Sequence, residues 1–238
     1  MDEKELFRLA LGLSEPWIVE TLEFSLEEKR LDITLNFPRG SKFPCPVCGT
    51  LCVIHDSDKR DWRHLNFFQH ETYLHARQPR INCPDHKVKT MEVPWARPGA
   101  GFTLLFEALV MVLAKNGMTP NAIGRIVDEH DTLIWRILNH YVEQARKEVD
   151  MSTVTQVGMD ETARAKGHKY VTVFMGFEER RILFVTEGKG AETLTAFKTD
   201  LEEHGGQAEQ VEEFSLDMSP AFQSGIKKEF PNAHMTFD

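Results

Sequence analysis

The amino-acid sequence predicts an α+β protein made of several small domains, and three observations carry this prediction. Residues 41–95 combine clustered cysteines with short strand-like runs, residues 101–150 show the apolar spacing of helices, and residues 154–238 alternate strand-like and helix-like runs. Of the 238 residues, 41% are hydrophobic and 27% are charged, which is the composition of a globular protein. The longest apolar stretch, residues 102–114, is well short of the roughly 20 residues that a membrane span requires.

Residues 1–40 are expected to form a short helix and a β-hairpin. Apolar residues recur at helical spacing over residues 2–13, and the runs WIVETLEF and LDITLNF predict two strands on either side of a charged turn. The first residues are acidic and lack the apolar core of a signal peptide, so the sequence shows no export signal.

Cysteine spacing predicts a structural zinc site in the second segment. Cys45 and Cys48 form a CxxC knuckle, and Cys83 and His86 repeat the same spacing later in the chain. Two such pairs supply the four ligands of a closed tetrahedral Zn²⁺ site, which holds a fold together and leaves no position for catalysis. The alternative is that the cysteines are small buried hydrophobic residues, which is what we expect of Cys52.

The cysteine distribution also bears on the cellular compartment. Three of the four cysteines fall within eight residues, which is unlike the disulfide framework of a small secreted protein. A reducing compartment is therefore expected, and since there is no export signal we place the chain in the cytoplasm.

The net charge of −9 argues against a nucleic-acid partner, but the distribution of charge permits one. Residues 41–100 are the one positive block, with nine basic and six acidic side chains. Basic and aromatic residues alternate there, which suits a surface that follows a phosphate backbone, although a small zinc-bound core with a solvated rim explains the pattern equally well. The basic residues of this pattern are Lys59, Arg60, Arg63, Arg77 and Arg80, and the four arginines are the candidate phosphate contacts. The histidines expected at the surface or in packing are His55, His64, His70 and His75.

After a Pro/Gly-rich linker at residues 93–101, the sequence predicts three helices within residues 101–150. The second begins at Thr119-Pro120, a capping residue followed by proline, and about four residues separate it from the third. These are the dimensions of a helix-turn-helix, and the alternative is an ordinary helical connector. The segment holds five basic and seven acidic residues, a negative balance that weakens the case for DNA binding. The residues of the third helix that include the outward-facing ones are Trp135, Arg136, Asn139 and His140, and the first three are the candidate DNA contacts.

Two aspartates stand at strand ends in the last segment. The strand VTQVGMDET places Asp160 near its end, and the fourth strand, VEEFSLDMS, ends in Asp217. The first and fourth strands of a mixed sheet in this order can lie side by side, which would bring the two carboxylates together. Such a pair favours Mg²⁺ or Mn²⁺ and metal-assisted phosphoryl transfer, although many strands end in an aspartate that only forms a turn.

Long stretches of the sequence match a known family over essentially the whole chain. They include CPVCG, RDWRHLNFFQHETYLHARQPRINCPDH, VPWARPGAGFTLLFEALVM, VGMDET, LFVTEGKGAETL, DMSPAF and PNAHMTFD. In these stretches the chain resembles the ISL-three (ISL3) family of insertion-sequence transposases. The resemblance implies an N-terminal zinc-binding domain, a helix-turn-helix and a ribonuclease-H-like catalytic domain that cuts and joins double-stranded DNA with Mg²⁺ or Mn²⁺. It also implies binding to the terminal inverted repeats of the element and assembly of copies of the chain on that DNA.

The resemblance also assigns roles to single residues. Asp160 in VGMDET matches the first catalytic aspartate, and Asp217 in DMSPAF matches the second. The matching zinc-ligand positions are Cys45, Cys48, Cys83 and His86. The third acid of the family, a glutamate, lies on a helix well beyond the TFD strand, and no glutamate of this chain matches it. We therefore expect a C-terminally truncated transposase whose catalytic domain, residues 154–238, is incomplete. The alternatives are a zinc-stabilised DNA-binding protein without catalytic activity and a remnant with neither function.

Overall fold

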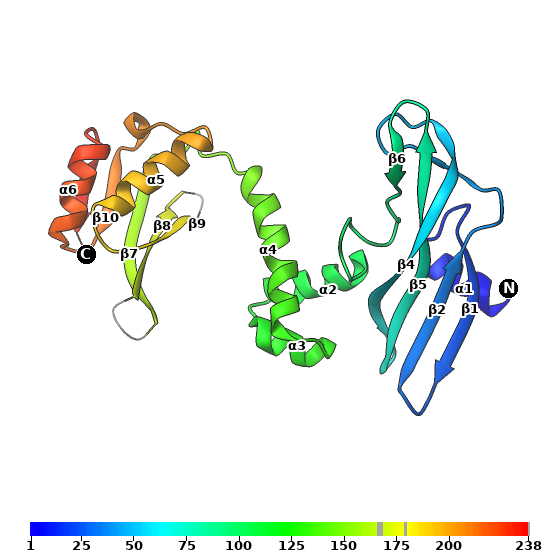
Figure 1. Ribbon diagram of the computed structural model, residues 1–238. Helices are drawn as coiled ribbons and strands as arrows, with labels where there is room; N and C mark the ends of the chain where they lie inside the picture. The colour runs from blue at the N-terminus through cyan, green and yellow to red at the C-terminus, as the bar shows by residue number, and fades with distance from the viewer. Residues whose placement is uncertain (166–168, 179, 238) are drawn as a thin grey trace. The chain divides into compact units, whose positions relative to one another are not determined.

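The computed structural model describes residues 1–165, 169–178 and 180–237 (Figure 1). The chain divides into two compact units, residues 1–140 and 141–238, and each is described by itself. Residues 166–168, 179 and 238, which fall in the predicted α/β domain, lie outside the described residues. Within the described ranges, no α-helix is both long and apolar enough to cross a bilayer.

A six-stranded sheet forms the body of the first unit. Its elements, preceded by helix α1 (Glu3–Ala10), are β1 (Ile18–Ser25), β2 (Arg30–Asn36), β3 (Lys42–Pro44), β4 (Leu51–Phe67), β5 (His70–Cys83) and β6 (Lys87–Thr90). The order is β1-β2-β5-β4-β3 with β6 also paired to β5, and only β2 and β5 run parallel. Because β2 pairs with β5, the predicted N-terminal hairpin and the predicted zinc-binding segment share one sheet and one hydrophobic core.

Residues 93–101, expected to form a linker, pack into the first unit instead. Trp95 is 6% exposed, and its ring centroid lies 4.7 Å from that of Trp17 and 5.5 Å from that of Trp62. The chain beyond them is tied to β4, since Arg63 N donates to Gly101 O at 2.9 Å and Thr103 N donates to Arg63 O at 3.0 Å. Burial of these aromatic rings therefore joins the helical segment directly to the sheet.

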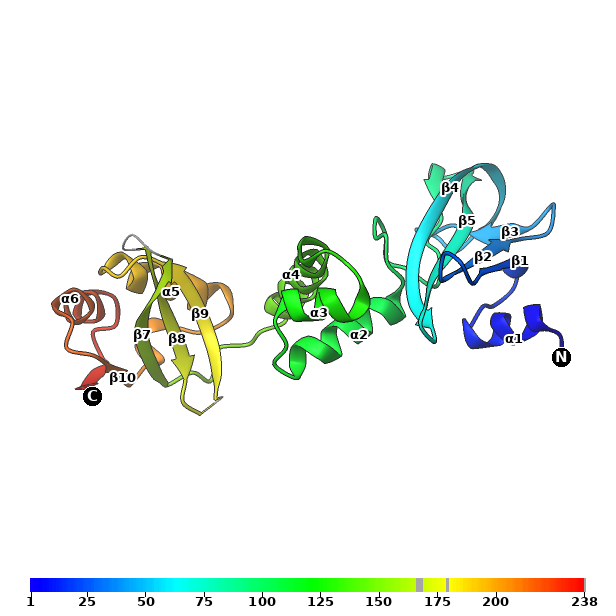
Figure 2. The same ribbon diagram turned by 90° about the horizontal axis from the view of Figure 1, so that it is seen from below.

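Three helices follow, as the sequence predicted (Figure 2). They are α2 (Leu104–Lys115), α3 (Pro120–Val127) and α4 (Asp131–Lys147). Thr119 caps α3, because its hydroxyl accepts a hydrogen bond from Ala122 N at 3.3 Å. Asp128 ends α3 in the left-handed conformation (φ 56°, ψ 47°), so that the chain turns into α4 within three residues. Helix α4 crosses the division between the two units after His140.

The second unit contains a five-stranded sheet with the order β11-β10-β7-β8-β9. Its elements are β7 (Gln156–Ala165), β8 (Lys169–Gly176), β9 (Arg181–Glu187), α5 (Glu192–Glu203), the short 3₁₀ helix Ala208–Gln210, β10 (Glu213–Leu216), α6 (Pro220–Glu229) and β11 (His234–Phe237). The three strands β7, β8 and β9 are antiparallel neighbours, whereas β10 runs parallel to both β7 and β11. The predicted adjacency of the first and fourth strands of this unit is therefore confirmed.

The two faces of this second sheet differ in their burial. On one face, Phe174 of β8 is fully buried and stacks on Phe197 of α5, with centroids 4.3 Å apart and planes 8° from parallel. On the other face, Met175 and Ile182 pair across β8 and β9 and are 41% and 61% exposed. Asp160 lies on this second face, since it pairs with Val173, two residues from Met175 on β8.

Candidate metal sites and nucleic-acid interface

The first metal site is formed by two short segments of the first unit. Cys45 and Cys48 lie in the turn after β3, where Gly49 adopts a positive φ of 73° and its N–H donates to Cys45 O at 2.8 Å. Cys83 is the last residue of β5, and His86 lies in the turn before β6. The antiparallel pairing of β3 with β4 and of β4 with β5 brings the two turns together.

The four side chains form a compact set with the dimensions of a zinc site. Their ligand atoms all lie within 4.8 Å of one another. Cys45 Sγ and Cys83 Sγ lie 3.8 and 3.6 Å from His86 Nδ1, and Cys48 Sγ lies 3.7 Å from Cys83 Sγ. A tetrahedral Zn²⁺ with bonds of about 2.0–2.3 Å has ligand-to-ligand distances of roughly 3.4–3.8 Å. The residues therefore fit structural zinc.

Local hydrogen bonding prepares Cys48 for metal binding. The side chain and the backbone of Thr50 lower the pKa of the Cys48 thiol to about 6, and the Thr50 hydroxyl lies 3.4 Å from its sulfur. The thiolate is the form of cysteine that binds metal. Cys52 is 4% exposed and belongs to the hydrophobic core, in agreement with its expected packing role.

Arg63 does not reach the surface, so the prediction that it contacts phosphate is wrong. The residue is 3% exposed, and its guanidinium carbon lies 5.4 Å from the ring centroid of Tyr73 and 5.5 Å from that of Phe106. Its Nη2 donates to Asn66 Oδ1 at 2.6 Å, and its Nε lies 3.6 Å from Glu129 Oε1. Arg63 therefore joins β4 to the helix-turn-helix from inside the unit.

Arg80 is on the surface, but its charge is neutralised. Both Nε and Nη2 donate to the carboxylate of Asp56, at 2.5 Å for Nε, and Asp58 lies 3.9 Å away. This hydrogen bonding lowers the pKa of the Asp56 carboxyl. A DNA phosphate would have to compete with Asp56 for Arg80, which makes Arg80 a weak candidate for a DNA contact.

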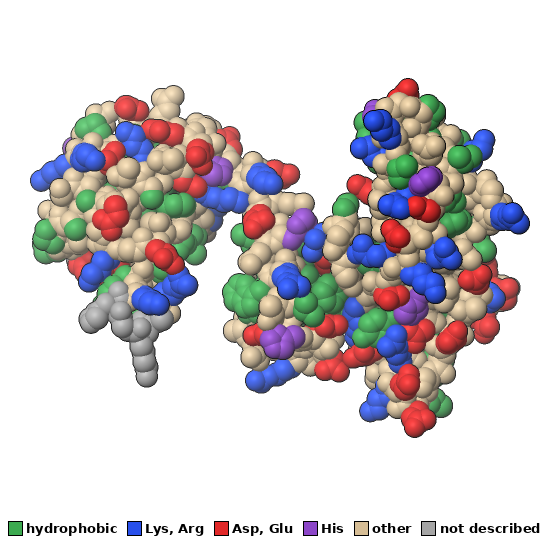
Figure 3. All heavy atoms as spheres, viewed as in Figure 1, with side chains coloured by type: hydrophobic (Ala, Val, Ile, Leu, Met, Phe, Trp, Pro, Cys, Tyr) green, Lys and Arg blue, Asp and Glu red, His purple; other side chains and the backbone are tan. Residues whose placement is uncertain are grey.

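Arg60 and Arg77 are the two candidates without a carboxylate partner among the residues that the structure describes. Arg60 stacks over the ring of Trp62 at 5.8 Å, and its Nη2 donates weakly to Ala100 O at 3.5 Å. Arg77 is exposed, and its Nε donates to Ser57 Oγ at 2.9 Å. Basic and acidic side chains are interspersed on the face of this unit seen in Figure 3. Whether a basic side chain can contact DNA therefore depends on whether an acidic neighbour already pairs with it.

The helix-turn-helix shows the expected division into a buried and an exposed face. Ile134 and Ile137 of α4 are 0% and 1% exposed. The predicted DNA-reading residues of α4, all of them exposed, are Trp135, Arg136 and Asn139. Gly124 of α3 is a structurally important residue that the sequence analysis did not identify. A Cβ at this position would lie 2.5 Å from Glu129 O, so a larger residue would obstruct the close approach of α3 to the turn. The signal was available as a lone glycine inside a helical pattern.

Asp160 and Asp217 line one pocket of about 620 Å³ in the second unit. Gly158 pairs with Ser215 on the neighbouring parallel strands, and each aspartate lies two residues further along its strand direction. Each carboxylate accepts its own next backbone N–H through Oδ1 at 2.7 Å. Both side chains are exposed, so their remaining oxygens face a hollow that a hydrated divalent cation could enter.

His75 is a second residue whose role the sequence did not indicate. Its Nδ1 lies 2.6 Å from Asp61 Oδ1 on β4, and its Nε2 lies 2.6 Å from Asp32 Oδ1 on β2. Burial opposes the charge, but hydrogen bonding to the two carboxylates outweighs it and raises the pKa of His75. Protonated His75 therefore links three neighbouring strands across the outer face of the sheet.

Comparison with known protein families finds three domain models that match successive parts of the chain, in the order zinc finger, helix-turn-helix and transposase domain. The zinc finger of the transposases of IS204, IS1001, IS1096 and IS1165 matches residues 41–86. The helix-turn-helix domain of transposase family ISL3 matches residues 91–142, and the DDE transposase domain of ISL3 matches residues 157–238. All three models describe domains of transposases.

Similar proteins agree with this class. The transposase of insertion sequence element IS1557 of Mycobacterium tuberculosis is 28% identical over 245 residues, which cover 98% of this chain and 53% of that protein. The transposase of IS1001 of Bordetella parapertussis is 27% identical over 238 residues, covering 96% of this chain and 56% of that protein. The chain belongs to the ISL3 family of transposases, and it spans about half the length of these relatives.

One solved structure, an intasome of simian T-cell lymphotropic virus in complex with a PP2A regulatory subunit, matches 54% of this chain and 51% of its own chain. The identity is 13% and the TM-score is 0.28, which is too low to bear on the fold.

Proposed function

We propose that the chain recognises the terminal inverted repeats of an insertion sequence through its first unit. The observation that carries this proposal is the helix-turn-helix, in which α4 buries Ile134 and Ile137 and leaves Trp135, Arg136 and Asn139 exposed. A second helix of this kind reads base edges in the major groove, where arginine pairs with guanine and asparagine with adenine. Zinc would stabilise the sheet of the first unit, and the ion pair of Arg63 on β4 with Glu129 in the turn before α4 would join that sheet to the helices.

We further propose that the second unit is part of a ribonuclease-H-like catalytic domain. The antiparallel strands β7, β8 and β9 are followed by two helix–strand units, α5–β10 and α6–β11. The first of these units places β10 beside β7 in the sheet. Asp160 and Asp217 would hold Mg²⁺ or Mn²⁺ at that junction. The metal would supply activation of water or of a 3′-hydroxyl for attack on a phosphodiester. We propose the cytoplasm as the localisation, which is the compartment expected from the cysteine pattern.

The recognition helix is tested by replacing Arg136 and Asn139 with alanine. Each variant is expected to lose about 1–3 kcal/mol of binding to terminal-repeat DNA, because each removes a base contact, and little binding to random DNA. Fluorescence anisotropy with both duplexes measures the difference. Glu143→Ala, an exposed change further along α4, serves as the control. Equal losses on both duplexes would show that α4 does not read sequence.

Catalysis is tested on the polypeptide of residues 1–238 itself. We expect it to bind terminal-repeat DNA but to cut it with Mg²⁺ or Mn²⁺ no faster than the Asp160→Asn variant, because only two matching acids are present among its residues. A gel assay for nicked end DNA makes this comparison. Cleavage well above the Asp160→Asn level would contradict the expected incompleteness and favour a complete site.

A further inference from the structure

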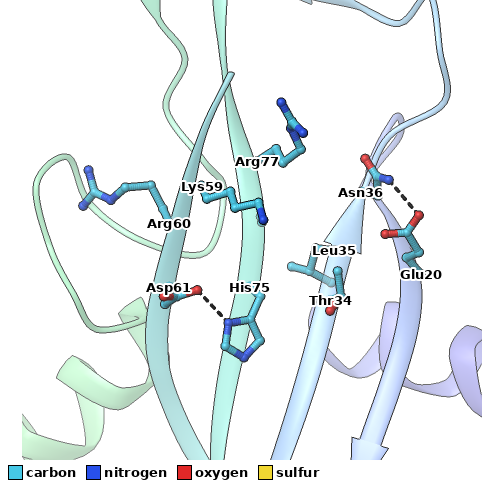
Figure 4. A pocket seen from close by; sticks show the side chains of 10 residues that line it. Glu20, Thr34, Leu35, Asn36, Lys59, Arg60, Asp61, His75 and Arg77 are labelled. Atoms are coloured by element: carbon cyan, nitrogen blue, oxygen red, sulfur yellow. Dashed lines mark hydrogen bonds and ion pairs between the residues drawn. The ribbon is translucent and has the colours of Figure 1, made fainter. Parts of the chain in front are cut away.

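A hollow of about 440 Å³ lies on the outer, polar face of the first sheet (Figure 4). Strands β1, β2, β4 and β5 all contribute to its lining. Lys59 of β4 and Arg77 of β5 lie beside each other at this hollow, whereas Arg60 lies across β4 and points away from them. The hollow is therefore lined by a pair of cations from adjacent strands.

This pair is unfavourable as it stands. Lys59 and Arg77 are direct partners in the antiparallel register of β4 and β5, so their side chains leave the same face at neighbouring positions. Like charges directly opposite each other on a sheet are destabilising. The next pair on the same face, Asp61 and His75, shows the opposite arrangement, with its charges matched at 2.6 Å.

The nearby acids are engaged elsewhere. Asp61 is hydrogen-bonded to His75, and Glu20 accepts a hydrogen bond from Asn36 at 2.8 Å. In the described parts of the chain, Lys59 and Arg77 form no ion pair. Glu20 and Asp61 also line the hollow, but neither forms an ion pair with Lys59 or Arg77. Two adjacent cations without an ion-pair partner favour an anion that comes from another molecule.

The geometry of Arg77 favours a phosphate group. Ser57 Oγ accepts a hydrogen bond from Arg77 Nε at 2.9 Å, which orients the guanidinium and leaves both terminal nitrogens available to donate. Terminal guanidinium nitrogens can bind two oxygens of one phosphate, and a lysine ammonium adds a mobile point charge beside them. The donor set therefore fits the two non-bridging oxygens of a phosphodiester.

We propose that Lys59 and Arg77 form a clamp for a backbone phosphate of the bound DNA, on the outer face of the zinc-stabilised sheet. This inference rests on the proposed DNA-binding function and adds a contact that the helix-turn-helix does not supply. The clamp contributes affinity and register on the duplex but reads no sequence, because phosphates are the same at every step.

The test is DNA binding by Lys59→Ala and Arg77→Ala at several salt concentrations, with terminal-repeat and random duplexes. Each variant is expected to bind both duplexes about three- to tenfold more weakly at low salt and to reduce the slope of log K against log salt by about one. Arg77→Lys should keep most of the slope. Lys227→Ala on α6, which removes an exposed positive charge from the second unit, is the matched control and should bind as wild type. Zinc content confirms that each variant is folded.

Wild-type affinities and slopes for both alanine variants would overturn the clamp and leave recognition by α4 intact. A loss confined to the terminal-repeat duplex would also overturn it, since a phosphate contact cannot discriminate sequence. If the variants lose only binding of inorganic phosphate, followed by ³¹P titration, the assignment to DNA is wrong. Failure of the wild-type chain to bind either duplex would refute the proposed function itself.

Discussion

Replacing Cys45 with serine is expected to remove the zinc ion and unfold the first unit. Cys45 is one of four ligands whose atoms lie within 4.8 Å of one another, and it is 2% exposed. Structural zinc contributes roughly 10–16 kcal/mol to small zinc-binding domains, whereas whole domains are stable by only about 5–15 kcal/mol. Elemental analysis should find about one Zn²⁺ per wild-type chain and almost none in the variant, whose residues 1–140 should become sensitive to protease.

Cys52→Ala provides the control for this experiment. Cys52 lies seven residues further along the chain and is buried, but it is not one of the four ligands. Its replacement removes a sulfur from the core and should cost about 1 kcal/mol without loss of zinc. A Cys45→Ser variant that keeps one zinc, or a Cys52→Ala variant that loses it, would show that the ligand set is assigned incorrectly.

Replacing Gly124 with alanine should destabilise the helix-turn-helix and weaken DNA binding at least tenfold. In an unobstructed helix this change stabilises by roughly 1 kcal/mol, because alanine has the higher helix propensity. Here the new Cβ would lie 2.5 Å from the backbone oxygen of Glu129 and 3.5 Å from the backbone nitrogen of Asp131. Overpacking of this kind costs about 1–3 kcal/mol, and the turn must move to relieve it. Thermal unfolding and anisotropy with terminal-repeat DNA measure the two effects.

Gly101→Ala is the same chemical change at a position where nothing lies within 4 Å of the added Cβ. This variant should melt and bind DNA like wild type. A Gly124→Ala variant that is as stable as Gly101→Ala and binds DNA equally well would contradict the account of the turn, because the close approach of α3 to the turn would then be unimportant.

The zinc ligands and the paired aspartates could be predicted from the sequence because local rules determine them. Two CxxC-like pairs need only a hairpin to bring them together, and β3, β4 and β5 supply it. Asp160 and Asp217 follow from strand alternation and from the return of the fourth strand to the first. Likewise, the three helices follow from apolar spacing and from capping at Thr119.

The sequence could not show which basic residues are buried, ion-paired or exposed, because this depends on pairing between distant segments. Arg63 and Lys59 leave the same face of β4, yet helix α2 and the turn at Glu129 cover Arg63 and leave Lys59 open. Arg80 is neutralised because Asp56 is its direct partner in the β4–β5 register, and this register cannot be read from either strand alone. Nor does local sequence show that β2 lies beside β5, which is what places Asp32 against His75.

Binding of the wild-type chain to the terminal repeats of its own element is the measurement that tests the central claim most directly. Labelled end duplexes are compared with a scrambled duplex of the same composition, at low and at physiological salt. The account predicts at least tenfold tighter binding to the end duplexes and a steep loss of affinity with salt on both. Equal affinity for end and scrambled DNA would contradict specific recognition by α4 and, with it, the proposed role of the first unit.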